Sequence, residues 1–195
     1  VGTWLNRADL TSYIPDFIRL GEQRIFYGGD EPHLTEPLRI PAMMTRATGT
    51  ITSSAIAFPT RFLEPVRVVA SSGGSDWSLD YIAPQMFSEH SNSSATPSVY
   101  TYLNNQIETS GSGAATYTLD YYQAFSALTS DSDTNWLLTN ACEIYLWGAL
   151  AEAKTYIEGD PSKELAFYAK AVSRLRQSEM QARFPGPLIV RHDGM

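Results

Sequence analysis

The sequence predicts an α+β fold in which helices from both ends of the chain enclose a β-rich middle. Three observations lead to this prediction. Apolar residues recur at the helical period near both ends, apolar and polar residues alternate through the middle, and glycine or proline separates these stretches. We expect a small helical bundle from residues 1–30 and 134–184, an inserted antiparallel β domain over residues 31–133, and an extended C-terminal tail over residues 185–195.

The N-terminal helix is predicted to begin near Pro15 and to end at Gly28-Gly29. Proline suits the first turn of a helix because its φ is already near the helical value and its missing N–H would have no partner there. One apolar face follows at helical spacing, made by Ile14, Phe17, Ile18, Gly21 and Ile25.

Strands are predicted over residues 45–52, 62–69, 77–81, 99–107 and 116–122. Residues 110–113 are expected to join the last two of these strands as a hairpin loop. Seven prolines between residues 32 and 97 argue against long central strands. We therefore expect a small antiparallel sheet or sandwich with protruding loops.

Two more helices are predicted in the last third of the chain. Thr134-Asn135 supplies a cap before Trp136, and Gly159-Asp160-Pro161 combines a helix stop with the start of a helix that ends near Arg183. Cys142 is expected to be a small buried residue of the first of these helices. The predicted core of the helical bundle comprises Phe17, Ile18, Ile25, Trp147, Leu150, Ala153, Leu165, Tyr168, Val172 and Leu175.

The sequence contains no catalytic or metal-binding motif that we recognise. Cys142 is the only cysteine, which excludes internal disulfides and multi-cysteine zinc sites. The three histidines have no partner at metal-ligand spacing, and the stretch beginning Asp131-Ser132-Asp133 lacks the glycine and the closing glutamate of a calcium loop. We therefore expect no catalytic residue, no metal and no cofactor. No apolar run approaches the ~18 residues of a membrane span, so no membrane partner is expected.

The net charge of −7 is concentrated in the middle third of the chain. Residues 66–133 hold one basic and seven acidic side chains, whereas residues 1–65 carry a net charge of −1 and residues 134–195 are neutral. An acidic stretch repels phosphate, so a conventional nucleic-acid binder is not expected. By itself this charge distribution favours carboxylates that keep an edge-rich β region soluble.

Two blocks of the sequence resemble a known family. The first runs from Trp4-Leu5-Asn6-Arg7 through Ile14-Pro15-Asp16-Phe17-Ile18 to Glu22-Gln23-Arg24-Ile25. The second runs from Leu128-Thr129-Ser130-Asp131 through Thr134-Asn135-Trp136-Leu137-Leu138 to Tyr156-Ile157. Together they resemble the head-to-tail adaptor (connector) proteins of tailed bacteriophages, also called tail-tube-A-like proteins. The likeness covers roughly the first 26 and the last 75 residues and is weak over residues 30–115. Gly21 and Cys142 depart from the family pattern, where alanine and proline are more usual.

The resemblance implies a structural virion protein, assembled in the cytoplasm of a bacterial host, and not an enzyme. It implies a homo-oligomeric ring of about twelve copies that joins the portal protein to a tail (nozzle or tail-tube) protein. DNA would pass through the ring without specific binding, and Asp76, Glu89 and Glu108 are expected to face its path. The C-terminal tail is expected to bind the portal or a neighbouring subunit, with its own β region as the alternative, through Phe184, Leu188, Ile189, Val190 and Arg191.

Two other function classes compete with the adaptor. A β-sandwich module of a phage tail could bind carbohydrate or a receptor through aromatic side chains, but their alternation along strands favours core packing. These aromatic residues are Trp77, Tyr81, Tyr100 and Tyr102. A tail-associated glycosidase is supported only by the number of carboxylates.

Overall fold

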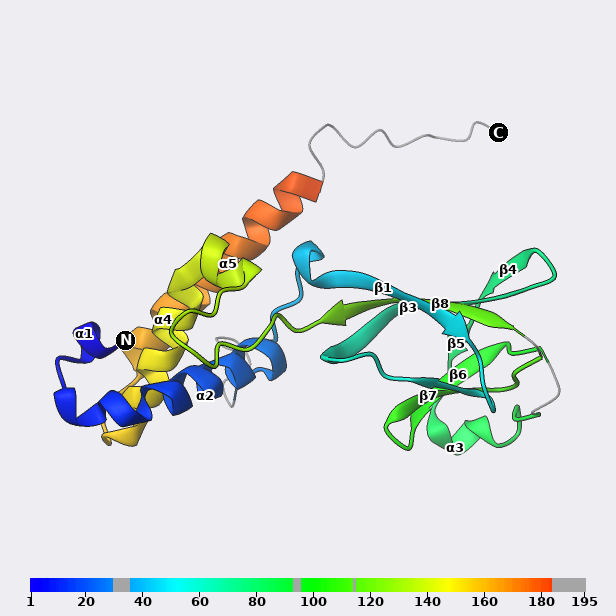
Figure 1. Cartoon of the computed structure of the whole chain (residues 1–195), viewed down its shortest axis with the longest axis horizontal. Helices are drawn as coiled ribbons and strands as arrows, with labels where there is room; N and C mark the ends of the chain where they lie inside the picture. The colour runs from blue at the N-terminus through cyan, green and yellow to red at the C-terminus, as the bar shows by residue number, and fades with distance from the viewer. Residues whose placement is uncertain (30–35, 93–95, 114, 184–195) are drawn as a thin grey trace. The chain divides into compact units, whose positions relative to one another are not determined.

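The computed structural model describes residues 1–29, 36–92, 96–113 and 115–183 of the 195-residue chain. It divides into two compact units, one formed by residues 1–42 together with the chain from Phe125 onward, the other by residues 43–124. The first unit is helical, and the second consists mainly of antiparallel strands (Figure 1). The predicted α+β class is therefore confirmed.

Three long helices make up most of the helical unit, and they come from the two ends of the chain. The predicted N-terminal helix has Pro15 in its first turn, and the two C-terminal helices begin at the expected caps. The side-chain Oδ1 of Asn135 accepts a hydrogen bond from the Leu138 N–H at 2.8 Å, and Asp160 accepts one from the Ser162 N–H at 3.0 Å. In chain order the helical elements are α1 (Gly2–Leu5), the 3₁₀ helix Ala8–Tyr13, α2 (Ile14–Tyr27), α4 (Trp136–Tyr156) and α5 (Ser162–Arg183).

Helix α4 is the central helix of this unit. Buried residues occur on every side of it, as expected for a helix enclosed by neighbours, and both α2 and α5 pack against it. The backbones come closest at two glycines: a Cβ atom added at Gly21 of α2 would lie 3.1 Å from the backbone nitrogen of Ala149. A Cβ atom added at Gly148 would lie 3.7 Å from the ring of Tyr168, so all three helices meet at this point.

The helical register of α4 is interrupted at Ala141, whose φ of −151° and ψ of 54° are not helical. Ala141 is buried and Cys142 is exposed, so the predicted burial of Cys142 is wrong. The prediction rested on the usual burial of free cysteine and did not locate the backbone break at Ala141, after which Cys142 lies at the surface.

The β unit contains two four-stranded sheets. The first has the strand order β1-β8-β3-β4 and the second β2-β7-β6-β5, and all pairings are antiparallel except the two-residue pairing of β5 with β6. The strands are β1 (Met44–Thr50), β2 (Ala55–Ala57), β3 (Phe62–Ser72), β4 (Ser75–Ser78), β5 (Asp80–Tyr81), β6 (Val99–Leu103), β7 (Gln106–Thr109) and β8 (Thr116–Gln123). Two short helical segments complete the described elements, the 3₁₀ helix Pro41–Met43 and α3 (Pro84–Phe87).

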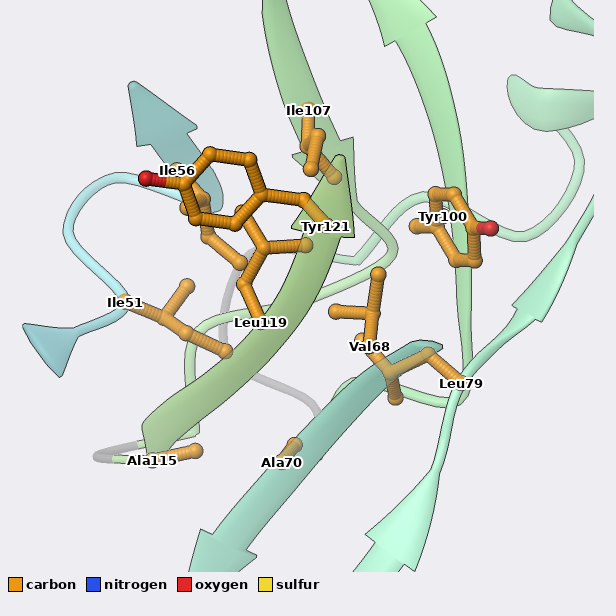
Figure 2. Close-up of a cluster of buried hydrophobic side chains, with 10 residues drawn as sticks. All are labelled: Ile51, Ile56, Val68, Ala70, Leu79, Tyr100, Ile107, Ala115, Leu119 and Tyr121. Carbon is orange, nitrogen blue, oxygen red and sulfur yellow. The ribbon is translucent and has the colours of Figure 1, made fainter. Parts of the chain in front are cut away.

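One apolar core joins the inner faces of the two sheets, as in a β-sandwich (Figure 2). Val68 and Leu119 enter it from the first sheet, and Ile56 and Ile107 from the second. Because side chains alternate along a strand, the residues next to these point away from the core on the outer face of each sheet.

Two strand predictions need correction. The predicted strand 99–107 is two strands, β6 and β7, because Asn104 and Asn105 take left-handed φ values of 51° and 58° and form a tight turn. As a result β7 and β8 lie in different sheets, and residues 110–113 cross between sheets instead of closing a hairpin. The predicted strand 77–81 is likewise divided between β4 and β5, one in each sheet.

Candidate functional site

The ten predicted residues of the bundle core all lie in the helical unit. Eight are buried, namely Phe17, Ile25, Leu150, Ala153, Leu165, Tyr168, Val172 and Leu175. Ile18 is half-buried beside Phe17. Trp147 is also half-buried, and its ring lies between two aromatic neighbours: it stacks on Phe167 at 4.7 Å and meets the edge of Trp4 at 5.5 Å.

The three carboxylates predicted to face DNA are not gathered on one surface. Asp76 is exposed on β4, next to the inward-facing Trp77, and therefore lies on the outer face of the first sheet. Glu108 follows the buried Ile107 on β7 and lies on the outer face of the second sheet, where it accepts a hydrogen bond from the Asn104 side chain at 2.7 Å. Glu89 is exposed after α3. Asp76 and Glu108 thus point away from the sandwich on opposite sides.

One acidic side chain of the β unit, Asp120, is neutralised by two neighbouring arginines. Asp120 of β8 accepts hydrogen bonds from Arg46 of β1 and from Arg67 of β3, at 2.6 and 3.0 Å. The hydrogen bond from Arg46, opposed in part by burial and reinforced by the bond from Arg67, lowers the pKa of Asp120. One carboxylate between two guanidinium groups leaves a local positive charge on the outer face of this sheet.

Most of the aromatic residues considered for a binding module pack inside the β unit. The Trp77 indole N–H donates to the Pro97 carbonyl at 2.6 Å, and Trp77 packs against the sandwich core. Tyr100 is buried and Tyr102 half-buried, with ring centroids 5.9 Å apart. Burial raises the pKa of both phenols. Of these four residues only Tyr81, which is 52% exposed, presents a ring to solvent.

The predicted C-terminal binding residues Phe184, Leu188, Ile189, Val190 and Arg191 lie outside the described residues. The structure instead draws attention to two stretches that were not predicted as a functional site. We call them the first connector, residues 36–42, and the second connector, residues 125–135. They are the two places where the chain passes between the helical unit and residues 43–124.

The second connector is held to the helical unit by a buried carboxylate. Glu22 of α2 is only 8% exposed and accepts a hydrogen bond from the Leu128 N–H at 2.9 Å. It also accepts one from the hydroxyl of Tyr145 on α4. Burial raises the pKa of Glu22, and the hydrogen bonds from Leu128 and Tyr145 oppose that rise.

Asn135 links the same connector to α4. Its side-chain N–H₂ donates to the Ser126 carbonyl at 2.7 Å and to the Tyr145 hydroxyl at 2.8 Å, while its Oδ1 caps the helix. Asn135, Tyr145 and Glu22 therefore form one hydrogen-bonded chain from the start of α4 to α2. Beside it, Phe125 stacks on Trp136 at 5.6 Å and lies 6.4 Å from the ring of Phe26.

A polar turn closes the middle of the second connector. The Asp133 carboxylate accepts hydrogen bonds from both the backbone and the hydroxyl groups of Thr129 and Ser130, at 2.7–2.8 Å. These hydrogen bonds lower the pKa of Asp133. The stretch that begins like a calcium loop is thus occupied by its own hydrogen bonds. Within the described residues, no group of three or more His, Cys, Asp or Glu could hold a metal ion.

The first connector is held by backbone contacts and one arginine of α5. The Leu38 N–H donates to the Ile25 carbonyl at 2.8 Å, and Leu38 is fully buried. Arg176 donates to the Glu36 carboxylate at 2.9 Å and to the Pro37 carbonyl at 2.8 Å. Both connectors are therefore fixed to the helical unit just before the chain leaves it.

Sequence reasoning found one of these residues and missed the others for a physical reason. Asn135 was predicted as a cap because a cap is decided by its immediate neighbours. The role of Glu22 depends on Leu128, which is 106 residues away along the chain, so no local pattern predicts this contact. The only local signal was that Glu22 follows Gly21 on the buried side of α2.

Comparison with known proteins bears on this arrangement. A model of the family described as SU10 adaptor protein matches residues 1–191, which include both connectors and the whole β unit. The chain belongs to the SU10 adaptor protein family. A search of curated proteins finds no match. Membership identifies this chain as a structural adaptor protein of a bacteriophage, as the resemblance of the two sequence blocks implied.

The sequence blocks that resemble adaptor proteins consist of residues with structural roles. The matched blocks quoted above contain the cap Asn135 and the first turn of α2, and the structure gives both a role in assembling the helical unit. Among the described helices, none is long and apolar enough to span a membrane.

Proposed function

We propose that this chain forms a ring of about twelve copies that joins the portal of a phage head to its tail and surrounds the path of the DNA. The observation that carries the proposal is the family match over residues 1–191. The family match gives a phage adaptor protein, and we add to it the closed ring, the contact with the portal and the contact with the tail. The narrower tail-tube-A-like assignment and the place in the virion belong to the same proposal.

The two fixed connectors support a mechanical role. An adaptor has to hold partners at a defined spacing, and a chain that left the helical unit through loose segments would not do so. Here each connector is tied to that unit by at least one buried or half-buried contact, through Leu38 in the first and through Glu22 in the second. These contacts hold both connectors within the helical unit.

A DNA-lining role is compatible with the charge of the β unit if one outer sheet face lines the channel. An acidic wall repels phosphate and lets DNA move without specific binding. Asp76 and Glu108 lie on opposite outer faces, so we propose that only one of them reaches the path of the DNA.

The test of the ring proposal is assembly of the purified full chain, alone and mixed with purified portal rings, followed by mass photometry and negative-stain microscopy. We expect closed rings with one symmetry axis, at least when portal rings are present as a template. A folded protein that stays monomeric both alone and with portal rings contradicts the proposal.

The C-terminal tail can be tested in the same assay. We propose that residues 185–195 dock onto the portal or a neighbouring subunit, because Leu188, Ile189 and Val190 form an apolar row suited to strand addition. A chain truncated after Phe184 should then join portal rings more weakly while its monomer melts at the same temperature. Undiminished portal binding, or a monomer that melts several degrees lower, contradicts this part of the proposal.

A further inference from the structure

Helices α2 and α5 each carry a line of solvent-exposed side chains, some of which also contact side chains of α4. Exposed residues at intervals of three and four form one line that starts at Tyr13, the last residue of the preceding 3₁₀ helix, and continues along α2; the exposed Arg19 lies beside this line. Its large side chains are Tyr13, Leu20 and Tyr27, which are 42%, 39% and 69% exposed. We call this line the α2 stripe, made of Tyr13, Asp16, Leu20, Gln23 and Tyr27.

The outer face of α5 has a different character. Phe167 is 39% exposed and stacks on Trp147, which in turn contacts the exposed Trp4. Lys163 and Lys170 stand on either side of Phe167, at one helical turn. Arg174 follows one turn later and pairs with Glu143. We call this surface the α5 face, made of Lys163, Phe167, Lys170 and Arg174; all four are exposed, and none is acidic.

We propose that the α2 stripe of one copy docks on the α5 face of the next copy. The proposal rests on the ring assembly proposed above and names its helical contact. Phe167 would pack against Leu20, and the two lysines would lie over the tyrosine rings and beside Asp16. A lysine ammonium group is attracted to the face of a tyrosine ring and to a carboxylate.

The charges of the two surfaces favour the α5 face of a second copy as the partner of the α2 stripe. Two α5 faces brought together would place Lys163 and Lys170 against the same cations, which is unfavourable. The α2 stripe carries Asp16, whose partner Arg19 is 3.3 Å away and whose side chain is well exposed. Such an exposed pair is weak and can exchange for an incoming lysine.

The geometry of the unit fits an assembly that repeats. The two surfaces differ and lie on two different helices packed on α4, so copies that repeat the contact in one direction make a heterologous assembly. Each copy that uses its α2 stripe still has its α5 face free. Repetition of one heterologous contact closes into a ring when the rotation between copies allows it.

Cross-linking between singly labelled chains tests this contact. In a Cys142→Ser background, Gln23→Cys puts one thiol in the α2 stripe and Ala166→Cys puts one beside Phe167; both positions are exposed and polar or small. We expect a short thiol cross-linker to give heterodimers from a mixture of the two variants and few homodimers from either alone. Gln23→Cys mixed with Met86→Cys, an exposed position of the β unit, is the matched control.

Two outcomes overturn the proposal: a heterodimer yield no higher than that of the control, or a dominant Gln23→Cys homodimer. A portal-bound ring that forms without the Gln23–Ala166 cross-link would show that the contact is wrong while the proposed function stands. Cross-linked head-to-tail chains that never join portal rings would support the contact and contradict the proposed function.

Charge reversal gives a second, independent measurement. Lys163→Glu combined with Lys170→Glu should weaken association about tenfold, as expected for a contact that depends on both lysines. Adding Asp16→Lys to that chain should restore part of the affinity, because each contact would again pair opposite charges. Unchanged association in the double variant, or no recovery in the triple variant, overturns the assignment. Equal circular dichroism spectra and melting temperatures show that these exposed substitutions leave the fold intact.

Discussion

At the residue scale, hydrogen bonds of a few polar side chains connect parts of the helical unit that are distant in the sequence. Asn135 makes three hydrogen bonds through one amide group, and Tyr145 passes the connection on to Glu22. Only Asn135 was predictable, because a cap depends on residues within one helical turn. The partners of Glu22 and Tyr145 are set by how α2 and α4 pack, which local sequence does not specify.

The two buried tyrosines of the helical unit should respond oppositely to loss of their hydroxyl groups. Tyr145→Phe removes the acceptor of the Asn135 bond and the donor to Glu22, so we expect it to lower the free energy of unfolding by about 1–2 kcal/mol. The hydroxyl of Tyr168 is buried without a hydrogen-bond partner among the described residues. Tyr168→Phe should therefore be neutral or stabilising, by up to ~1 kcal/mol.

Urea denaturation of the two variants at one pH measures this difference directly. An equal loss of stability in both would show that the hydrogen-bonded chain through Tyr145 contributes nothing.

Glu22 should make stability depend on pH in a direction opposite to most carboxylates. Its pKa is raised in the folded state by burial, so the folded protein binds a proton at Glu22 more tightly than the unfolded chain does. Stability from this group is therefore present below the ordinary glutamate pKa of about 4.3 and is lost as the pH rises through the raised value. Glu22→Gln stays uncharged, so its melting temperature relative to the unmodified protein should rise across this window.

Melting curves from pH 4 to pH 8 check the slope. Asp120 and Asp133, whose pKa values are lowered, are present in both proteins and cancel in the difference. Glu179→Gln, on the half-exposed side of α5, is the surface control. A Glu22→Gln difference that is constant with pH would contradict the prediction.

At the element scale, helices were easier to predict than strands for a clear reason. Helix periodicity and caps are local, and α2 and α5 begin and end close to where Pro15, Asp160 and the expected end near Arg183 place them. Alternation in strands continues through a tight turn such as Asn104-Asn105, so it cannot show where one strand ends. Nor can it show to which sheet a strand belongs, as with β4 and β5.

The crossing of α2 and α4 gives a prediction with a matched pair of glycines. Alanine favours a helix over glycine by about 0.5–1 kcal/mol. At Gly148 an added Cβ would lie 3.7 Å from its neighbours, which is an ordinary contact. Gly148→Ala should therefore raise the free energy of unfolding by about 0.5–1 kcal/mol. At Gly21 an added Cβ would sit 3.1 Å from a backbone nitrogen of α4 and 3.3 Å from a backbone carbon, and overpacking of this kind costs about 1–3 kcal/mol.

We therefore expect Gly21→Ala to be destabilising although it improves helix propensity, and chemical denaturation of both variants measures the sign of each. The resembled adaptor proteins usually carry alanine at this position, which makes the outcome informative about how closely α2 approaches α4 in this chain. A stabilising Gly21→Ala would mean that the helices separate at little cost.

At the scale of the whole molecule, fold class and family were accessible from sequence, but the surfaces were not. The charge count located the acidic excess in the middle third. It could not show that β4 and β7 belong to different sheets, and this is what puts Asp76 and Glu108 on opposite outer faces. It also could not show that Asp120 is neutralised by two arginines from neighbouring strands.

The opposed positions of Asp76 and Glu108 make the proposed channel testable in assembled particles. A channel wall formed by one outer face would bring only one of these carboxylates near the DNA. Asp76→Asn and Glu108→Gln each remove one negative charge per copy. A ring of about twelve copies therefore loses about twelve negative charges with either substitution. The substitution on the channel face should slow genome ejection, because weaker repulsion allows more phosphate contact, and the effect should be largest at low salt. The other substitution should leave the ejection rate unchanged and so acts as the matched control. Equal effects of both substitutions would contradict a channel wall formed by one face, and no effect of either at any ionic strength would mean that neither sheet face lines the path of the DNA.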